Sequence, residues 1–266
     1  MPERTTSLAV LAVVDGLRPD ALEAARCPTL SALLDNGAFT SRARSLMPTI
    51  TLPCHVSLFH SVPPTRHGIM TNVWVPMARP VPGLADVVHG AGLRSAFFYN
   101  WEPLRCLSQP GSLDFSYFRA NCDTDPYGDQ VLAEEAARYI ASDHPDFVFV
   151  YFGTLDPAGH EHGWMTEEYL AQLERVDGAL ATLVAALPGD ATLLTTSDHG
   201  GHERIHGTDA PEDMVVPWVM AGPGIRRGHE VEAEVTLLEA APTLARVLGV
   251  APHPTWEGDC VEEIFE

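Results

Sequence analysis

Short hydrophobic runs separated by longer amphipathic stretches constrain the fold of this 266-residue chain more than any other feature. The runs are nearly continuous in apolar and β-branched residues and are bounded by turn residues, which is typical of strands buried on both faces. A sheet of such strands needs helices on both faces, so the pattern predicts an α/β fold with a mostly parallel central sheet. The candidate strands are Leu8–Val14, Ser95–Tyr99, Phe147–Phe152, Thr192–Thr196 and Val215–Ala221.

Amphipathic stretches between these runs predict the helices. Thr166 precedes two glutamates and is the expected N-cap of the helix that begins at Glu167. Two Pro/Gly-rich segments, Val75–Gly83 and Leu107–Asp125, are expected to be long loops rather than linkers, so we expect one domain over residues 1–266. The candidate helices are Pro19–Leu34, Gly83–His89, Tyr127–Ala141, Glu167–Leu187 and Leu237–Leu248.

The charged residues restrict what the chain can bind. Its 16 basic residues, all arginine, face 36 acidic ones, which gives a formal charge of −20. The absence of lysine excludes P-loop NTPases, protein kinases and Schiff-base enzymes, all of which need a lysine amine. The acidic balance also argues against binding to duplex nucleic acid. A small phosphate-bearing substrate stays compatible with this charge if metal ions supply local positive charge.

Cysteine usage and the N-terminal sequence bear on the compartment. The five cysteines are scattered without a CxxC pair, so neither a disulfide framework nor a cysteine zinc site is expected. The apolar run Leu8–Val14 is short for a signal peptide, and no stretch of about 18 apolar residues is present. We therefore expect a cytoplasmic protein that does not associate with membranes, and the oligomeric state stays open.

Three aspartates follow candidate strands: Asp15, Asp156 and Asp198. Ligands in sheets of this kind collect beyond the carboxyl ends of the strands. Any one aspartate at such a position could be a helix cap or a turn residue. All three together, two of them with nearby histidines, form the pattern of a metal site.

Histidines extend this pattern. His160 lies four residues after Asp156, which places both side chains on one face of a helical turn, and His199 adjoins Asp198 in a glycine-rich turn. For one remaining ligand position the alternatives are His206, His202 and His162, and we favour His206. More than four ligands suggest two divalent ions about 3.5–4 Å apart. Zinc suits these ligands best, with manganese or iron as alternatives.

Thr51 is the candidate nucleophile. It precedes Leu52-Pro53, and a proline in the first turn suits a helix that runs to about His60. The hydroxyl would then lie near unpaired N–H groups that favour an anion. A threonine hydroxyl needs a base or a metal ion to act as a nucleophile. The alternative is that Thr51 is a plain helix N-cap.

These sequence blocks resemble the alkaline-phosphatase superfamily, nearest the type I phosphodiesterase/nucleotide pyrophosphatase branch. The matching blocks are VVDG, PTITLPCH, HGIMTN, LDPAGHEHG, TSDHGG and IHG, in the family's order. The resemblance implies a three-layer α/β/α sandwich. It also implies that Asp156, His160 and His206 hold one zinc, and that the other is held by Asp15, Asp198, His199 and the oxygen of Thr51.

The same resemblance assigns Asn72, with the Thr51 backbone amide, to hold a phosphoryl oxygen. It implies hydrolysis of a phosphodiester or nucleotide pyrophosphate bond through a phosphothreonine on Thr51. A phosphonate hydrolase, a phosphomonoesterase, a phosphomutase and a non-catalytic metal-binding protein stay open. A sulfatase is disfavoured, because Cys54 lies in CHV rather than in a CxPxR motif.

Other residues of these blocks carry weaker expectations. His55 and His67 are expected to be structural. Trp74, Tyr99 and Trp101 could form an apolar lip at the site, but core packing is the preferred interpretation. Asp156 lies 105 positions after Thr51, which leaves little room for a substrate-capping insertion.

Overall fold

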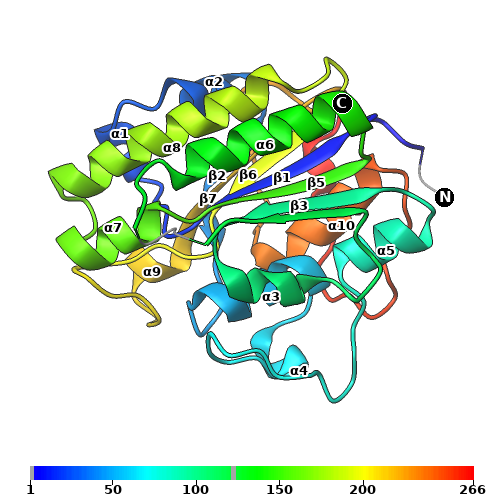
Figure 1. Ribbon diagram of the computed structural model, residues 1–266, viewed down its shortest axis with the longest axis horizontal. Coiled ribbons are helices and arrows are strands. Elements are labelled where there is room, and N and C mark those ends of the chain that lie inside the picture. Colours follow the sequence, from blue (N-terminus) through cyan, green and yellow to red (C-terminus); the bar gives the residue numbers. More distant parts are fainter. Residues whose placement is uncertain (1–2, 121–123) are drawn as a thin grey trace.

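An eight-stranded sheet runs through the computed structural model, which describes residues 3–120 and 124–266 (Figure 1). The strand order is β4-β3-β5-β1-β6-β7-β2-β8. Central strand β1 (Ala9–Val14) pairs in parallel with β5 (Phe147–Phe152) and with β6 (Thr192–Thr196). Every residue of these three strands is buried, which explains why their sequences are continuous apolar or β-branched runs.

Helices cover both faces of the sheet, which confirms the predicted fold (Figure 1). Alternate residues of β1 point to opposite faces: Val10, Ala12 and Val14 join one core cluster, and the residues between them join the other. On the first face lie α2 (Pro28–Asn36), α6 (Gly128–Asp143) and α8 (Glu167–Ala185). On the second lie α3 (Thr51–His60), α5 (Leu84–Gly90) and α10 (Ala240–Val247).

One side of the sheet departs from the parallel arrangement. The predicted strand Val215–Ala221 (β7) is present, but it runs antiparallel to β6 and to β2 (Ala38–Arg44). The sequence did not predict β2, because only three of its seven residues are buried and its register shifts between Thr40 and Ala43. The short β8 (His229–Glu230) pairs in parallel with β2 and completes this side.

Two predicted segments were wrong in detail. The expected helix Pro19–Leu34 is two helices, α1 (Ala21–Ala24) and α2, because the backbone is extended at Ala25 and Pro28 starts a new helix. The expected loop Leu107–Asp125 contains β4 (Phe115–Phe118), which pairs in parallel with β3 (Ser95–Tyr99). None of the four β4 residues is fully buried, so no continuous apolar run marked it. Residues 121–123 of that segment lie outside the described part of the chain.

The remaining elements are short. The expected helix Leu237–Leu248 is a short 3-10 helix, η2 (Leu237–Glu239), followed directly by α10. The predicted N-cap of α8 is confirmed, because the Thr166 hydroxyl accepts a hydrogen bond from Tyr169 N. None of the described helices is both long and apolar enough to cross a lipid bilayer. The other elements are α4 (Pro64–His67), η1 (Glu102–Leu107), α7 (Leu155–His162), α9 (Pro211–Met214) and η3 (Glu262–Ile264).

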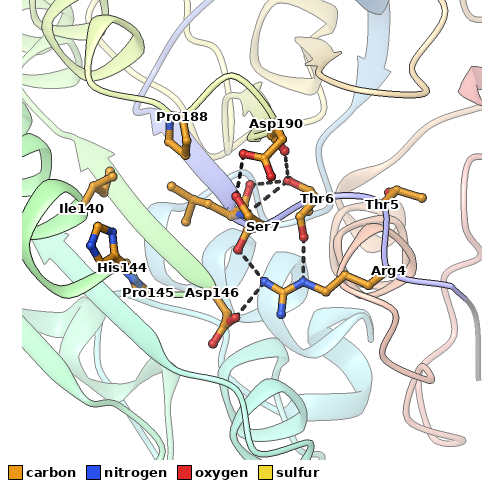
Figure 2. Close-up of a pocket in the computed structure, with 11 residues that line it drawn as sticks. Arg4, Thr5, Thr6, Ser7, Ile140, His144, Pro145, Asp146, Pro188 and Asp190 are labelled. Carbon is orange, nitrogen blue, oxygen red and sulfur yellow. Dashed lines mark hydrogen bonds and ion pairs between the residues drawn. The ribbon is translucent and has the colours of Figure 1, made fainter.

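A hollow of about 640 Å³ lies at the start of β1 and β5 (Figure 2). Four of its polar side chains form two pairs: Arg4 Nη2 lies 2.7 Å from Asp146 Oδ1, and Ser7 Oγ donates to Asp190 Oδ1 at 2.8 Å. These charges are already satisfied within the protein. The chemistry-bearing residues gather at the other end of the same strands.

Candidate metal centre

The three predicted aspartates lie beyond the carboxyl ends of three adjacent strands. Asp15 directly follows β1, Asp198 follows β6 by two residues, and Asp156 lies in the first turn of α7, just after β5. Gly16 lets the chain pass close to α7: it has a φ of +73°, and a Cβ at this position would lie 3.2 Å from Asp156 Cα. Strand order and one glycine therefore bring the carboxylates together.

Backbone carbonyls orient the three histidines of the site. The Nδ1 atoms of His160, His199 and His206 lie 2.7–2.9 Å from the carbonyl oxygens of Arg204, Gly200 and Thr49, respectively. A carbonyl oxygen can only accept, so each Nδ1 carries the proton and each Nε2 presents a lone pair. This arrangement is typical of imidazole rings prepared to bind a metal ion.

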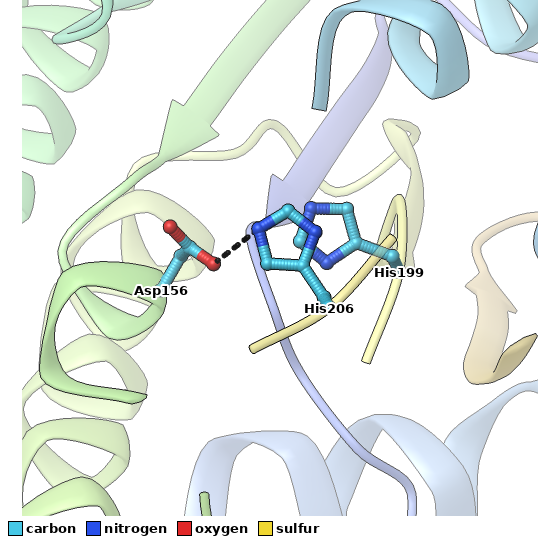
Figure 3. A group of neighbouring side chains, drawn as sticks. All are labelled: Asp156, His199 and His206. Carbon is cyan, nitrogen blue, oxygen red and sulfur yellow. Dashed lines mark ion pairs between the residues drawn. The ribbon is translucent and has the colours of Figure 1, made fainter. Parts of the chain in front are cut away.

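These Nε2 atoms meet the carboxylates in two overlapping groups. Asp15, Asp198 and His199 form one group, and Asp156, His199 and His206 form the other, which Figure 3 shows. In each group, potential ligand atoms lie within 4.8 Å of one another. His160 Nε2 lies 3.4 Å from Asp156 Oδ2 and 3.1 Å from His206 Nε2. The structure therefore gathers all six predicted Asp and His ligands at one place, with His199 shared between the groups.

The chemistry of this cluster fits divalent cations. Asp15 Oδ1 and Asp198 Oδ2 are buried and, within the described residues, make no hydrogen bond. The lone pairs of His160 and His206 face each other at 3.1 Å, which is unfavourable without a cation between them. Burial, and then the charges of Asp198 and Asp156, raise the pKa of Asp15 well above its ordinary value. A set of nitrogen and oxygen donors with so much concentrated negative charge suits zinc-type metals.

His206 is the histidine that joins the group among the three alternatives. Burial, followed by the neighbouring His199, lowers the pKa of His206 to about 3, so its imidazole is neutral at physiological pH. His202 instead places Nδ1 2.7 Å from Asp213 Oδ1, and His162 Nε2 lies 3.7 Å from a carboxylate oxygen of Glu161. Both of these rings are engaged elsewhere.

Thr51 is the first residue of α3, and its side chain does not cap the helix. Ile50 occupies the N-cap position without a side-chain cap bond, whereas Thr51 Oγ1 lies 3.3 Å from His199 Nε2. Because that nitrogen carries a lone pair, the hydroxyl is the donor. The geometry therefore disagrees with a plain N-cap and directs the hydroxyl toward the candidate metal ligands.

Asn72 reaches the same helix start from the loop after α4. Its Oδ1 accepts a hydrogen bond from the backbone N–H of Leu52 at 3.0 Å, one residue beyond the amide that the resemblance pairs with it. This bond leaves the amide N–H groups of Asn72 as donors for a ligand. The small pocket here, about 100 Å³, is lined by Asp15, Thr51, Asn72, Trp101, Tyr151, Gly153, Asp156, Pro157, His160 and His206.

Two aromatic residues of this pocket were missed or undervalued. Trp101 lines it, whereas Tyr99 is buried and its hydroxyl bonds the exposed Ser116, away from the pocket lining. The hydroxyl of Tyr151 donates to Asp15 Oδ2, and a Cβ at Gly153 would lie 2.4 Å from the Tyr151 ring. Nothing in a strand sequence distinguishes a tyrosine that binds a carboxylate from one that fills the core.

The two histidines expected to be structural are buried. His55 Nδ1 donates to Thr51 O at 2.8 Å and lies 3.4 Å from Asp198 Oδ2, so this ring connects α3 to a candidate ligand. His67 accepts from Ile69 N through Nδ1 and bonds Ser57 through Nε2. His67 thus holds the loop that leads to Asn72.

A mostly parallel sheet covered by helices on both faces, with Asp and His donors beyond its strand ends, defines an α/β protein with a candidate metal centre. Its sequence matches the family model for type I phosphodiesterase/nucleotide pyrophosphatase over residues 9–209. The chain therefore belongs to that family.

Individual proteins of known name match the chain at low sequence identity. The chain is 25% identical over 212 residues to human ectonucleotide pyrophosphatase/phosphodiesterase family member 1, covering 70% of this chain and 23% of that protein. It is 31% identical over 179 residues to phosphopentomutase of Methylobacterium, covering 65% and 40%. The chain thus spans less than a quarter of the length of the first of these relatives.

Solved structures share the fold across almost the whole chain. Murine ectonucleotide pyrophosphatase/phosphodiesterase 5, as an inactive threonine-to-alanine variant in complex with AMP, superposes with a TM-score of 0.83 at 14% identity, covering 99% of this chain and 100% of that one. Alkaline phosphatase PafA gives 0.83 at 12% identity, with full coverage of both chains. At sequence identities of 12–14%, these superpositions show a shared fold and nothing more specific.

Proposed function

We propose that this protein is a two-metal phosphoesterase that hydrolyses a phosphodiester or nucleotide pyrophosphate bond through a phosphothreonine on Thr51. The observation that carries the proposal is the position of Thr51 Oγ1, 3.3 Å from His199 Nε2 at the start of α3 and free of any capping role. A site that only stored metal would have no use for a hydroxyl placed in this way. The inactive threonine-to-alanine variant of the murine relative supports a catalytic threonine in that protein.

The chain's own residues suggest the course of the reaction. Thr51 Oγ1, with its proton passed to water, would attack phosphorus in line with the leaving oxygen. The P–Oγ1 bond would form as the ester bond breaks, and the leaving oxygen would take a proton from water. The Asn72 amide and the backbone N–H of Thr51 at the start of α3 would bind a non-bridging phosphoryl oxygen. Two divalent cations, held by the six Asp and His residues, would supply positive charge to the phosphoryl oxygens and lower the pKa of the hydroxyl. Water would then hydrolyse the phosphothreonine and restore Thr51.

The pocket lining favours a diester over a monoester. Among the described residues that line it there is no arginine, and Asn72 offers a neutral donor. A phosphate diester carries one negative charge on the phosphoryl group, whereas a monoester dianion would benefit from an added positive group. Phosphonate and phosphomonoester hydrolysis are the alternatives that the assay below separates.

The test compares p-nitrophenol release from bis(p-nitrophenyl) phosphate, p-nitrophenyl phosphate and p-nitrophenyl phenylphosphonate, with and without EDTA. We expect EDTA-sensitive release, with kcat/KM highest for the diester. Thr51→Ala should lower kcat about 1,000-fold or more while bound metal, measured by elemental analysis, stays unchanged. Substantial activity in this variant would contradict the nucleophile. No EDTA-sensitive release from any of the three esters would favour a non-catalytic metal-binding protein.

A further inference from the structure

One buried carboxylate outside the metal centre has no part in the proposed reaction. Asp129 lies in the first turn of α6 and is 2% exposed. Burial raises its pKa to about 6, so the carboxylate is ionised at pH 8. A buried charge is costly unless hydrogen bonds satisfy it, so the groups that bind Asp129 show what this charge holds in place.

Asp129 binds both residues of the connection between β5 and α7, which are Gly153 and Thr154. Its Oδ1 accepts the backbone N–H of Gly153 at 3.0 Å. Its Oδ2 accepts the backbone N–H of Thr154 at 3.2 Å and the hydroxyl of the same residue at 2.6 Å. Asp156 and His160 follow on α7. The carboxylate therefore fixes the start of the helix that carries two candidate metal ligands.

Two further elements join this network. Asn100 follows β3, directly precedes Trp101 of the pocket, and donates Nδ2–H to Asp129 Oδ1 at 2.7 Å. From α8, Gln172 donates Nε2–H to the Thr154 hydroxyl at 2.6 Å. Helices α6 and α8 cover the same face of the sheet (Figure 1). The connection between β5 and α7 is thereby held from β3, α6 and α8 at once.

Other ligands of the candidate centre are positioned by different parts of the chain. Asp15 directly follows β1 and Asp198 follows β6 by two residues, whereas His206 is oriented by the Thr49 carbonyl at 2.7 Å. Among the described residues, every hydrogen bond to Asp129 comes from the segments named above. A change at Asp129 should therefore displace one half of the centre and spare the other.

We propose that Asp129 is a positioning residue for the metal ion that Asp156, His160 and His206 would hold, acting through the backbone between β5 and α7 without touching metal or substrate. The inference rests on the proposed function for the two-ion arrangement. Asparagine at this position has the same shape, but its NH2 group would face donors that now meet a carboxylate oxygen. Buried N–H groups without an acceptor are unfavourable, so the start of α7 would shift relative to His206.

The first test titrates metal-free protein with Zn²⁺ at pH 8 against a chromophoric chelator. Groups that orient metal ligands typically contribute about 10- to 100-fold to metal affinity, and we expect Asp129→Asn to weaken one of two zinc sites about 10-fold. The matched control is Asp177→Asn, because Asp177 is also 2% exposed and accepts the backbone N–H groups of Thr29 and Leu30 at the start of α2. It should lower stability in urea and leave both zinc affinities unchanged. Equal losses of zinc affinity in the two variants would overturn the inference.

Single-site backgrounds assign the affected ion. With Asp156→Ala, the remaining zinc is bound by the other half of the centre, and adding Asp129→Asn should change its Kd less than about twofold. With Asp15→Ala, which keeps the ligands on α7, the same addition should still weaken zinc binding about 10-fold. The reverse pattern, or an equal effect in both backgrounds, would contradict the proposed role.

Thr154 tests the same path with the carboxylate intact, and it decides the question if Asp129→Asn does not fold. Thr154→Ser keeps the hydroxyl that donates to Asp129 and should retain parental zinc affinity, whereas Thr154→Val should weaken the same site as Asp129→Asn. Ester hydrolysis by the parent protein, with zinc affinity unaffected by Asp129→Asn and Thr154→Val, would overturn the inference and leave the proposed function standing. No ester hydrolysis, with the zinc effects as expected, would overturn the proposed function and support the positioning role.

Discussion

The two carboxylate oxygens of Asp15 lie in different surroundings. Oδ2 accepts a hydrogen bond from the Tyr151 hydroxyl, whereas Oδ1 is buried without a hydrogen bond within the described residues and lies 3.3 Å from His199 Nε2. The Tyr151 ring has room in this position because Gly153 carries no Cβ, and its centroid lies 5.2 Å from that of the His55 ring, in an edge contact. This arrangement directs one oxygen of Asp15 toward the neighbouring ligands and holds the other in place.

Removing the Tyr151 hydroxyl should therefore weaken metal binding. Substitutions of groups that orient metal ligands typically reduce metal affinity about 10- to 100-fold, and we expect Tyr151→Phe to fall in that range. The measurement is competition for Zn²⁺ against a chromophoric chelator. Tyr99→Phe removes a buried hydroxyl that bonds Ser116 and should leave the affinity unchanged. An unchanged affinity in Tyr151→Phe would show that Asp15 needs no such support.

The residue types of the site were readable from the sequence, whereas several roles were not. Asp15, Asp156 and Asp198 were predictable because each follows soon after an apolar strand run in the sequence. The sequence favours His206 over His202, but the contact that holds His202 elsewhere, with Asp213 eleven residues further along the chain, appears only in the structure. Contacts between distant segments, such as Tyr151 with Asp15, leave no local pattern.

Helix α8 supports the turn that carries Asp15. The hydroxyl of Tyr169, in the first turn of α8, donates to the Gly16 carbonyl at 2.8 Å, and Trp164 Nε1 donates to the same oxygen at 2.9 Å. The start of α8 is fixed in turn by the Thr166 hydroxyl, which also donates to Gly163 O at 2.8 Å. One helix end thus connects a local sequence signal to the position of a candidate ligand.

Loss of this cap should lower stability by a modest, measurable amount. Thr166→Ala removes the N-cap of α8, and we expect the free energy of unfolding in urea to fall by about 1 kcal/mol. Thr166→Ser, which keeps the capping hydroxyl, is the matched control. A decrease of similar size in both variants would point to the loss of the threonine methyl group rather than of the cap.

The loop between α4 and Asn72 should respond to acid. Burial, followed by the charge of His60, lowers the pKa of His67 to about 4 from its usual 6.5. The unfolded chain therefore binds more protons between these values, and stability falls as pH decreases from 6.5 to 4. The contribution is up to about 3 kcal/mol, because each pKa unit corresponds to about 1.4 kcal/mol.

Urea unfolding of metal-free protein at a series of pH values measures this contribution. Compared with the parent protein, His67→Asn should show a flatter dependence between pH 6.5 and 4, while His89→Asn, at an exposed position on α5, should show the parental slope. If the free energy of unfolding depends on pH in the same way in all three proteins, His67 does not contribute to the loss of stability in acid.

The central part of the fold was predictable from the sequence, and the edges were not. Buried strands such as β1, β5 and β6 consist of apolar or β-branched residues because helices cover both of their faces. Strands β2 and β4 lie toward the edges and mix exposed with buried residues, so their sequences look like loops. The direction of a strand in the sheet also cannot be read from its own residues. Strand β7 has the composition of a parallel strand, but it runs antiparallel to β6.

At the scale of the molecule, metal removal should lower thermal stability. The centre concentrates three carboxylates in a chain of formal charge −20, so cations that bind only the folded state stabilise it. At a metal concentration 100 times the Kd the gain is about 2.7 kcal/mol. In a chain of this size that corresponds to roughly 5–10 °C in Tm.

Differential scanning fluorimetry of EDTA-treated protein, before and after Zn²⁺ is added back, checks this expectation. Mg²⁺ at the same concentration should give a smaller shift, because it prefers oxygen ligands and keeps its water. An identical Tm with EDTA and with Zn²⁺ would contradict a metal site built from the native fold.

The imidazole orientation at the centre depends on three main-chain carbonyls, those of Thr49, Gly200 and Arg204. No point substitution can delete a carbonyl, so single mutations have few ways to turn these rings away from the metal. Insertions and deletions in the three loops can, because they shift the backbone itself. Genetic drift is therefore expected to tolerate replacement of the exposed Arg204 far better than a change in loop length, whereas Gly200 is constrained because a Cβ there would lie 2.1 Å from Glu212 O.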